Sequence, residues 1–251
     1  MRRELFLVGV SGALVIIGIV AIWAASLKIP DIESLYERKI EQSTKIYDRT
    51  GTILLDDLAE GVTRTVVPIE EVSPYIQKAV VAIEDDEFYT HRGVKPTAII
   101  RAMLSNIASG SFLGGQGGST ITQQVVKNSI LTKDKTVTRK VKEWVLSIKL
   151  EQVLPKEKIL ELYLNESPYG GSLYGIEEAS QAFFGKHAKE VDLTEAAYLA
   201  ALPQAPTYYS PYGNHRADLD ARKNLVLRRM NELGFITNSE YEAARAEIIE
   251  F

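Results

Sequence analysis

The sequence predicts a mainly α-helical domain that is joined by a short β segment to one N-terminal transmembrane helix. Three observations support this fold class: a charge-free run over residues 5–26, extended patterning over 43–69, and helical patterning from Pro74 to the C-terminus. The 251 residues are enough for one large domain with its own core, or for two small ones. The expected divisions are a cytoplasmic tip and transmembrane helix at 1–27, a stalk with the β segment at 28–66, and the helical domain at 67–251.

The composition excludes several classes of function. Charged residues make up 25% of the chain and the formal net charge is −4, which argues against a nucleic-acid-binding protein with its basic face. The absence of cysteine excludes disulfides, thiolate nucleophiles and zinc–thiolate sites. His91, His187 and His215 are too widely spaced for a histidine-rich metal site to be expected.

The run LFLVGVSGALVIIGIVAIWAAS carries no charge. A helix of this length spans roughly 30 Å of hydrocarbon at about 1.5 Å per residue. A cleaved signal peptide is the alternative, but its apolar region would be shorter, about 7–15 residues. Arg2 and Arg3 precede the run, so the positive-inside rule puts the N-terminus in the cytoplasm and everything after Lys28 outside.

The later elements follow from local signals. KIPDIESLYERKIEQS is a polar stalk, STKIYDRTGTILLDD predicts two strands around an Asp-Arg-Thr-Gly turn, and VTRTVVPI predicts a further extended run. Two helix starts are well marked, by Asp192 and Thr194 in one case and by Pro155 in the other. Helices are expected at 75–90, 96–109, 118–131, 133–153, 156–164, 174–184, 193–201, 216–233 and 238–248.

A glycine-rich loop precedes a polar helix. SGSFLGGQGGS holds five glycines in eleven residues, which makes it either flexible or able to approach a ligand closely. A helix from Ser119 would place four polar side chains on one face at i, i+3, i+4 and i+7 spacing: Thr120, Gln123, Gln124 and Lys127. A solvated face would more usually mix Glu with Lys, and a helix N-terminus attracts anions. An anion or sugar site and a solvated face therefore stay open as alternatives.

Four adjacent carboxylates stand in AIEDDEFYTHRG, from Glu84 to Glu87. Such a run can form a solvent-exposed acidic surface, bind a cation, or shift the pKa of one of its carboxylates. Because neighbouring negative charge raises the pKa of a carboxylate toward the range useful for a base, tuning would suit a catalytic role.

A further carboxylate, Glu143, has Arg139 at i−4 and Lys140 at i−3. Alone this would be a surface ion pair worth a few tenths of a kcal/mol. The helix has an apolar face made by Val137, Val141, Trp144, Val145 and Ile148, with Arg139, Glu143, Leu146 and Leu150 roughly opposite, so Glu143 is expected to be partly buried. With the acidic run and the glycine loop, it makes a set suited to transfer from an anionic leaving group to a hydroxyl acceptor.

Five stretches carry a family resemblance. EDDEFYTHRG, GGSTITQQVVKN, RKVKEWVLSIKLE, KILELYLNESPYGGSLYGIEEASQAFFGK and LTEAAYLAALPQAPTYYSP resemble, in order, the five signature motifs of family 51 glycosyltransferases. These are the peptidoglycan glycosyltransferase modules of class A penicillin-binding proteins and of monofunctional transglycosylases. The resemblance covers about 45–245 and implies a lysozyme-like fold with a small jaw near the membrane at about 97–117, whose apolar run 103–113 would dip into the lipid. Phe183 and Pro168 depart from the usual pattern.

The implied reaction polymerises lipid II into β-1,4 glycan and releases undecaprenyl diphosphate. By resemblance, Glu84 is the general base for the acceptor 4-hydroxyl, and Glu143 is the second catalytic carboxylate, acting at the donor diphosphate directly or through a cation. The implied substrate-binding residues are Ser119, Thr120, Gln123, Gln124, Lys127, Asn128, Arg139, Lys140 and Lys186. Structural support is expected from Asp85, Phe88, His91, Gly93 and Asn165. Asp86 and Glu87 fall at variable positions and are expected to be simply exposed.

The resemblance also implies a cofactor, binding partners and a cellular location. A divalent cation near Glu143, Mg²⁺ or Mn²⁺, is the one cofactor left open, and no metal site is certain. Expected partners are lipid II, the growing glycan strand, membrane lipids and other cell-wall synthesis proteins, with no nucleic acid. The protein would be a single-pass protein of the bacterial cytoplasmic membrane with its catalytic domain outside.

Two other functions stay open. A lysozyme-type glycoside hydrolase also uses carboxylates at a sugar bond, but it does not need the cations Lys127, Arg139 and Lys140, which a diphosphate leaving group does. A membrane-anchored scaffold that only binds glycan would not need both Glu84 and Glu143. No Ser-x-x-Lys occurs in the chain, so it is either monofunctional or a truncated bifunctional enzyme, and its stalk and C-terminal stretch favour the second.

Overall fold

A computed structural model describes most of the chain beyond the β segment. The described residues are 63–97, 118–131 and 137–251, together with 44–47, 49–50, 54–58 and scattered positions within the first 27. The stalk at 28–43 and the apolar jaw run 103–113 lie outside them, as does most of the predicted transmembrane run and of the helix expected at 96–109. Within the described part of the chain, no helix is long and apolar enough to cross a membrane.

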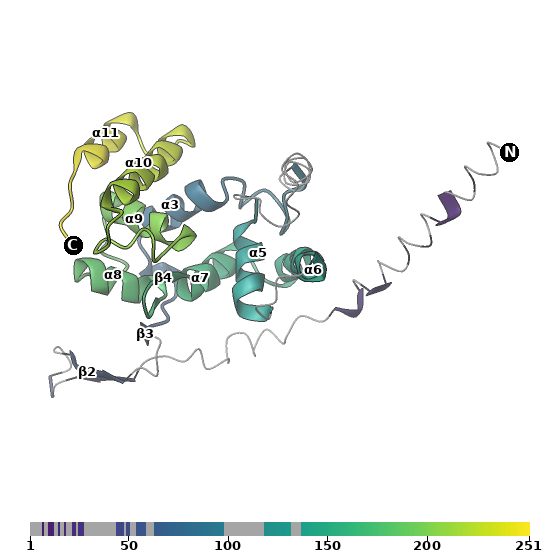
Figure 1. The fold of residues 1–251 in the computed structure, drawn as a ribbon, viewed down its shortest axis with the longest axis horizontal. Helices are drawn as coiled ribbons and strands as arrows, with labels where there is room; N and C mark the ends of the chain where they lie inside the picture. Colours follow the sequence, from purple (N-terminus) through teal and green to yellow (C-terminus); the bar gives the residue numbers. More distant parts are fainter. Residues whose placement is uncertain are drawn as a thin grey trace.

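The described body is mostly helical, as predicted (Figure 1). Its helices are α3 (Pro74–Glu84), α5 (Ile121–Val125), the π-helix η2 (Val126–Ile130), α6 (Val137–Val153), α7 (Lys156–Glu166), α8 (Ile176–Phe184), α9 (Leu193–Ala201), α10 (Arg216–Glu232) and α11 (Asn238–Ala246). Two short 3₁₀ turns, η1 (Ile69–Glu71) and η3 (Leu202–Gln204), connect them.

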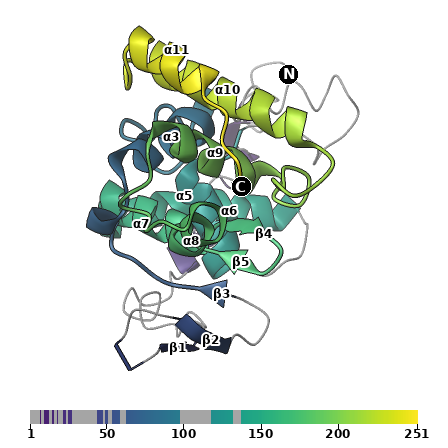
Figure 2. The same cartoon turned by 90° about the vertical axis from the view of Figure 1, so that its left-hand side faces the viewer.

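Two small sheets accompany the helices. Strands β1 (Thr44–Tyr47) and β2 (Leu54–Leu58) form the predicted antiparallel hairpin, which Figure 2 shows away from the helical body. The third extended run does not join this hairpin. Instead β3 (Thr63–Arg64) pairs in parallel with β5 (Leu173–Tyr174), which pairs antiparallel with β4 (Pro168–Gly170). The chain before α3 is thereby fixed against the segment between α7 and α8.

Helix α3 packs against both α9 and α10, which also pack against each other. It starts cleanly because Ser73 caps it, with its Oγ accepting from the Tyr75 N–H at 3.3 Å, and because Pro74 occupies the first turn. Helix α9 begins after Asp192, as the sequence predicted from Asp192 and Thr194, and the structure adds a capping box between Asp192 and Glu195. The helix is buried along nearly its whole length. Its small buried residues are Ala196, Ala197, Ala200 and Ala201, which allow α3 and α10 to pack closely against it.

Two predicted helix boundaries are wrong. The helix expected at 75–90 ends at Glu84, because Asp85 leaves the helical conformation with φ −160° and its carboxylate accepts a hydrogen bond from the Ile121 N–H. The helix expected at 118–131 starts at Ile121 and turns into a π-helix after Val125. Both changes concern the segments that carry the candidate site.

The burial of α6 also differs from the prediction. Its expected apolar face includes Ile148, whose residue is 38% exposed, whereas Leu146 and Leu150 on the opposite side are in the core. Glu143 lies on the buried side with these leucines and is fully buried rather than partly buried. The hydrophobic spacing alone could not decide which side faces the core, because both sides carry apolar residues.

Gly93 sets how closely the loop after α3 approaches α6. Its φ is +84°, in the left-handed region, and an added Cβ would lie 2.5 Å from the backbone oxygen of Ser147 on α6. On its other side the Gly93 carbonyl accepts a hydrogen bond from Thr120 Oγ1 at 2.7 Å. The missing side chain therefore allows the loop to contact both α6 and the start of α5.

We expect Gly93→Ala to lower the free energy of unfolding by about 2–5 kcal/mol. A left-handed backbone costs a residue with a Cβ about 1–2 kcal/mol, and forced overpacking adds about 1–3 kcal/mol. The matched control is Gly171→Ala, where φ is +56° but no atom lies within 4 Å of the added Cβ, so only the backbone cost applies. Chemical denaturation measures both variants, and equal losses would contradict the close approach to α6.

Candidate active site

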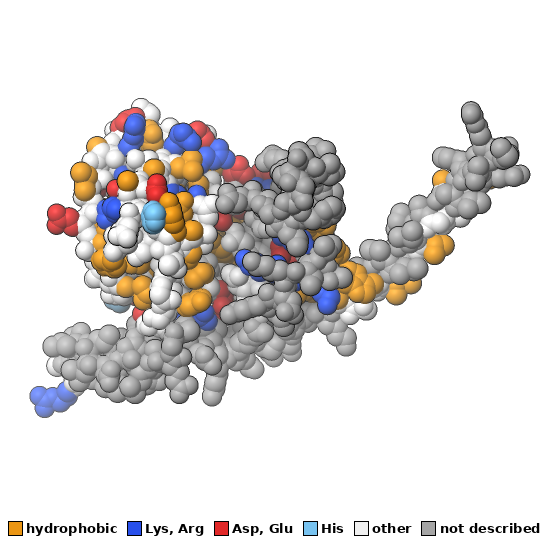
Figure 3. Space-filling model, in the orientation of Figure 1, with side chains coloured by type: hydrophobic (Ala, Val, Ile, Leu, Met, Phe, Trp, Pro, Cys, Tyr) orange, Lys and Arg blue, Asp and Glu red, His pale blue; other side chains and the backbone are white. Residues whose placement is uncertain are grey.

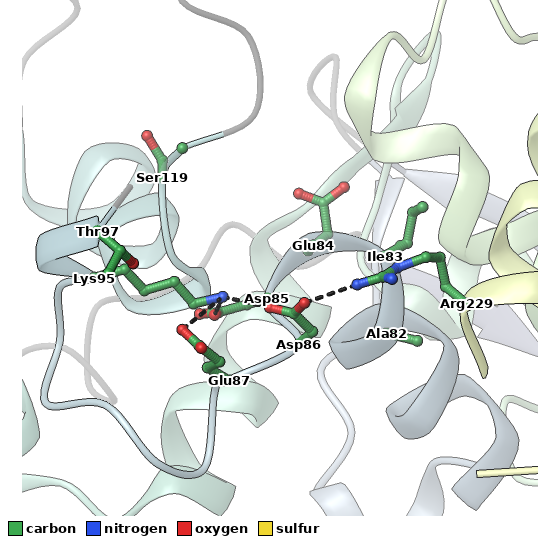
Figure 4. A pocket seen from close by; sticks show the side chains of 11 residues that line it. Ala82, Ile83, Glu84, Asp85, Asp86, Glu87, Lys95, Thr97, Ser119 and Arg229 are labelled. Carbon is green, nitrogen blue, oxygen red and sulfur yellow. Dashed lines mark hydrogen bonds and ion pairs between the residues drawn. The ribbon is translucent and has the colours of Figure 1, made fainter. Parts of the chain in front are cut away.

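Glu84 lines a polar pocket that is built from three separate parts of the chain. Residues 82–87, Lys95 and Thr97 come from α3 and the loop after it, Gly118 and Ser119 precede α5, and Arg229 comes from α10 (Figure 4). The pocket brings together three of the predicted site residues, namely Glu84, Asp85 and Ser119.

The carboxylate of Glu84 is held by residues from two other helices. Gln124 Nε2 of α5 donates a hydrogen bond of 2.7 Å to Oε2 of Glu84, and Arg222 Nη2 of α10 lies 3.8 Å from Oε1. The Glu84 side chain is 15% exposed. In Figure 4 it points away from the charged groups of the next three residues. This carboxylate is therefore both accessible and fixed in direction.

Asp85 turns inward and joins the loop to α5. Its buried carboxylate accepts from the Ile121 N–H at 3.0 Å and contacts His91 Nε2 and Lys95 Nζ, each at 2.8 Å. Burial alone would raise the pKa of Asp85, but the hydrogen bonds from His91 and Lys95 outweigh it and lower the pKa. His91 Nδ1 accepts from the Gly93 N–H at 3.1 Å, so the ring carries its proton on Nε2 and donates it to Asp85.

Asp86 is exposed, as expected, but it also forms ion pairs that the sequence did not predict. Its Oδ1 lies 2.6 Å from Lys95 Nζ, and its Oδ2 lies 2.7 Å from Arg229 Nη2 on α10. The hydrogen bond from Lys95 lowers the pKa of Asp86. Glu87 is mostly exposed and lies 3.8 Å from Lys95 Nζ. The negative charges of Asp85 and Asp86 are thus paired with cations, which weakens their repulsion of the Glu84 carboxylate.

The polar stripe expected on α5 is not formed as one face. Thr120 and Gln123 are buried in a reciprocal capping box, in which Thr120 Oγ1 accepts from the Gln123 N–H and Gln123 Oε1 accepts from the Thr120 N–H. The π-helix after Val125 then changes the spacing to Lys127 and Asn128, which are exposed. Contact of these residues with substrate stays a prediction.

Glu143 and Lys140 form a charged pair at the other side of Ser119. Lys140 Nζ contacts Glu143 Oε1 and also donates a hydrogen bond of 2.9 Å to Ser119 Oγ. Glu143 is buried, whereas the Lys140 side chain is about one third exposed at 34%. Because Ser119 lines the pocket of Glu84, this contact joins the pair on α6 to that pocket. Arg139, one turn before Glu143 on the same helix, is half-buried.

The residues around Glu143 do not fit a divalent cation. Among the described residues, no group of three or more His, Asp or Glu side chains could hold a metal ion. The cation beside Glu143 is the ammonium of Lys140. The hard-cation chemistry of Mg²⁺ or Mn²⁺ needs several oxygen ligands, and the described residues around Glu143 do not supply them by themselves.

The remaining predicted residues have different surroundings. Phe88 is fully buried under Lys156 Nζ, which lies 4.6 Å from the ring centroid. The amide of Asn165 on α7 makes two hydrogen bonds with the backbone of Val67, at 3.0 and 2.8 Å, and so fixes the segment before α3. Lys186 does not line the pocket of Glu84. It lies 2.6 Å from Glu195, whose hydrogen bond raises the pKa of Lys186.

The sequence did not predict three cations that pair with the carboxylates of the site: Lys95, Arg222 and Arg229. Lys95 follows the acidic run by only a few residues, and a Lys near four carboxylates was a signal that could have been used. The two arginines are more than 130 residues beyond Glu84 in the sequence. No local pattern connects them with it, because only the packing of α10 on α3 brings them near.

The transglycosylase family profile matches residues 52–231 of this chain. The chain is 44% identical to penicillin-binding protein 1A of Aquifex aeolicus over 216 residues, which are 86% of this chain and 29% of that protein. It is 40% identical to penicillin-binding protein 1A/1B of Bacillus subtilis, over 96% of this chain and 25% of that protein.

A crystal structure of penicillin-binding protein 1A from Haemophilus influenzae has a TM-score of 0.46 and 24% identity to this chain, covering 83% of this chain and 21% of that one. The family assignment rests on the profile and the sequence relatives rather than on this likeness. The chain spans less than a third of the length of the curated relatives it matches. The chain therefore belongs to the transglycosylase family of enzymes, which confirms the family and the enzyme class that the five motifs predicted.

Proposed function

We propose that this chain polymerises lipid II into β-1,4-linked glycan strands and releases undecaprenyl diphosphate, as part of bacterial cell-wall synthesis. Family membership supports the reaction type. The observation that carries the proposal is the double role of Ser119, which lines the pocket of Glu84 and accepts a hydrogen bond from Lys140. A carboxylate suited to accept a proton and a cation suited to hold a diphosphate thus flank one polar pocket.

Glu84 acts as the general base in this proposal. The acceptor 4-hydroxyl gives its proton to the Glu84 carboxylate while its oxygen forms a bond to the anomeric carbon of the donor. The bond from that carbon to the diphosphate oxygen breaks, and the diphosphate leaves with the electron pair. Gln124 Nε2 lies 2.7 Å from Oε2 and Arg222 Nη2 lies 3.8 Å from Oε1, so the carboxylate is fixed in direction, and its exposed part faces the acceptor.

Glu143 acts through Lys140 in this proposal. The carboxylate is buried and in contact with the ammonium, so it fixes the direction of Lys140 rather than reaching a sugar itself. Lys140 then stabilises the negative charge that develops on the departing diphosphate, together with Arg139 and the exposed Lys127. Lysine is a common phosphate ligand because it brings a compact charge on a flexible stem.

This cationic set argues against a lysozyme-type hydrolase. Glycoside hydrolases need two carboxylates at the sugar bond, one on each side. Here the second carboxylate is already paired with Lys140 and buried. A neutral glycan leaving group would gain little from these cations, whereas a diphosphate gains a direct charge interaction.

We also propose that the catalytic domain works at the outer surface of the bacterial cytoplasmic membrane, anchored by residues 5–26. Lys149 of α6 donates a hydrogen bond of 3.2 Å to the Ala25 carbonyl and contacts that of Leu27, so the anchor would end against the helix that carries Glu143. Ile148 and Val153 expose apolar surface on the same helix. Figure 3 shows hydrophobic side chains at described positions of the N-terminal segment and where this segment meets the body. A substrate with a lipid tail requires a site near the headgroups.

We expect Glu84→Gln to reduce polymerisation of labelled lipid II by at least about 10²-fold, because the amide keeps the shape but cannot accept the proton. The melting temperature should stay close to that of the wild type. Glu87→Gln is the matched control, since it makes the same change at an exposed side chain three residues away. Near wild-type polymerisation by Glu84→Gln would refute the assignment of the base.

We expect Lys127→Ala to lower kcat/KM for lipid II by about 10–100-fold, because a charge-assisted contact is worth about 1.5–3 kcal/mol. Lys127 is exposed and makes no ion pair with another described residue, so stability should change by less than about 0.5 kcal/mol. Lys189→Ala, at an exposed ion pair with Glu71, is the control. A stability loss without a change in activity per folded molecule would make Lys127 structural.

We expect the chain without residues 1–27 to bind lipid vesicles more weakly than the full chain, yet measurably, because the apolar run 103–113 adds an interfacial contact. Replacing Leu104, Ile107, Phe112 and Leu113 with serine in the truncated chain should release it from the vesicles. Co-sedimentation compares the two truncated forms. If both partition equally, the run 103–113 does not meet the membrane.

A further inference from the structure

Arg222 connects α10 to the carboxylate of Glu84, although 138 positions separate the two residues. Its side chain is 12% exposed and its Nη2 lies 3.8 Å from Oε1 of Glu84. The guanidinium is fixed by other contacts. Its Nε donates a hydrogen bond of 3.0 Å to the Ala201 carbonyl at the end of α9, and its centre lies 5.6 Å from the ring centroid of Tyr209. The direction of its positive charge toward Glu84 is therefore set by the fold.

Glu84 lies at the C-terminal end of a helix, near two buried tyrosines. It is the last residue of α3, where the unpaired carbonyls of the helix give the negative end of the dipole. Burial raises the pKa of two fully buried tyrosines nearby, Tyr163 and Tyr169, and the charge of Glu84 raises it further, so both hydroxyls stay neutral. The compensation for the charge of Glu84 therefore comes from the groups that contact its carboxylate, Gln124 and Arg222.

The other charged groups near Glu84 are directed elsewhere. Lys95 contacts Asp85 and Asp86, and Arg229 contacts Asp86 (Figure 4). Gln124 contributes a hydrogen bond but no charge. Arg222 is thus the cation that pairs with Glu84 in the described part of the chain.

We propose that Arg222 is a positioning residue for Glu84: its charge attracts Oε1 while Gln124 holds Oε2, and together they aim the carboxylate at the acceptor. This inference rests on the proposed role of Glu84 as the base. Arg222 does not touch the reacting atoms. It affects the rate by orienting the Glu84 carboxylate and by pairing with its charge.

The test compares Arg222→Gln, Arg222→Lys and the wild type in lipid II polymerisation over a range of pH. For Arg222→Gln we expect kcat to fall by about 10–100-fold, the scale of a misplaced catalytic group, with KM changed less than about twofold. Loss of the cation disfavours the ionised carboxylate, so the acidic limb of the kcat–pH profile should move to higher pH. Arg222→Lys should restore part of kcat and move the limb back.

Arg228→Gln is the matched control, because it removes the same charge from the same helix at an exposed ion pair with Glu232. Its kcat and its pH profile should equal those of the wild type. A fall in kcat with an unmoved acidic limb in folded Arg222→Gln and Arg222→Lys would overturn the proposal, since it would indicate a merely structural role.

A stability cycle tests the pair without any assay of activity. Melting temperatures are measured for Glu84→Gln, Arg222→Gln and the double variant. If the two groups interact, the double variant should lose less than the sum of the single losses. If the losses in melting temperature were additive, the proposed pairing of Arg222 with Glu84 would be overturned. If the wild type failed to polymerise lipid II, the proposed function would fall, and this cycle would still decide whether Arg222 acts on Glu84.

Discussion

The buried carboxylate of Asp85 is the interaction on which the site depends. It accepts the N–H of Ile121 at the start of α5 and is paired with His91 and Lys95 from the loop after α3. A buried charge of this kind is stable only when its partners satisfy both oxygens. Because Asp85 ends α3 and holds α5 at once, it fixes the two elements that carry Glu84 and Gln124 relative to each other.

The same constraint explains why Glu84 can stay exposed to a ligand. Asp85 turns inward and Asp86 is held sideways between Lys95 and Arg229, so the backbone at the end of α3 has little freedom left. Glu84 then points away from the other three carboxylates, as Figure 4 shows, and it lines the polar pocket. Four adjacent carboxylates are tolerated because they point in different directions and two of them have close cationic partners, which removes most of their mutual repulsion.

Local signals in the sequence predicted much of the helical body. Asp192 and the proline before Lys156 predicted the starts of α9 and α7 correctly, because a helix start is decided by neighbours in the chain. The end of α3 could not be predicted in this way, since the partner of Asp85 is the N–H of Ile121, 36 residues away. The buried side of α6 was also undetermined, because only the neighbouring helices choose between two apolar faces.

The candidate site shows the same division between local and distant information. The motifs identified Glu84 and Glu143, but the groups that direct them are fixed by packing: Gln124 from α5 for the first and Lys140 with Ser119 for the second. Each carboxylate can therefore be found from a local sequence motif, but its orientation depends on residues from other elements or on packing. In the proposed reaction, proton transfer and diphosphate binding both depend on direction at the scale of a hydrogen bond, so the packing of α5, α6 and α10 around the end of α3 contributes to the proposed chemistry.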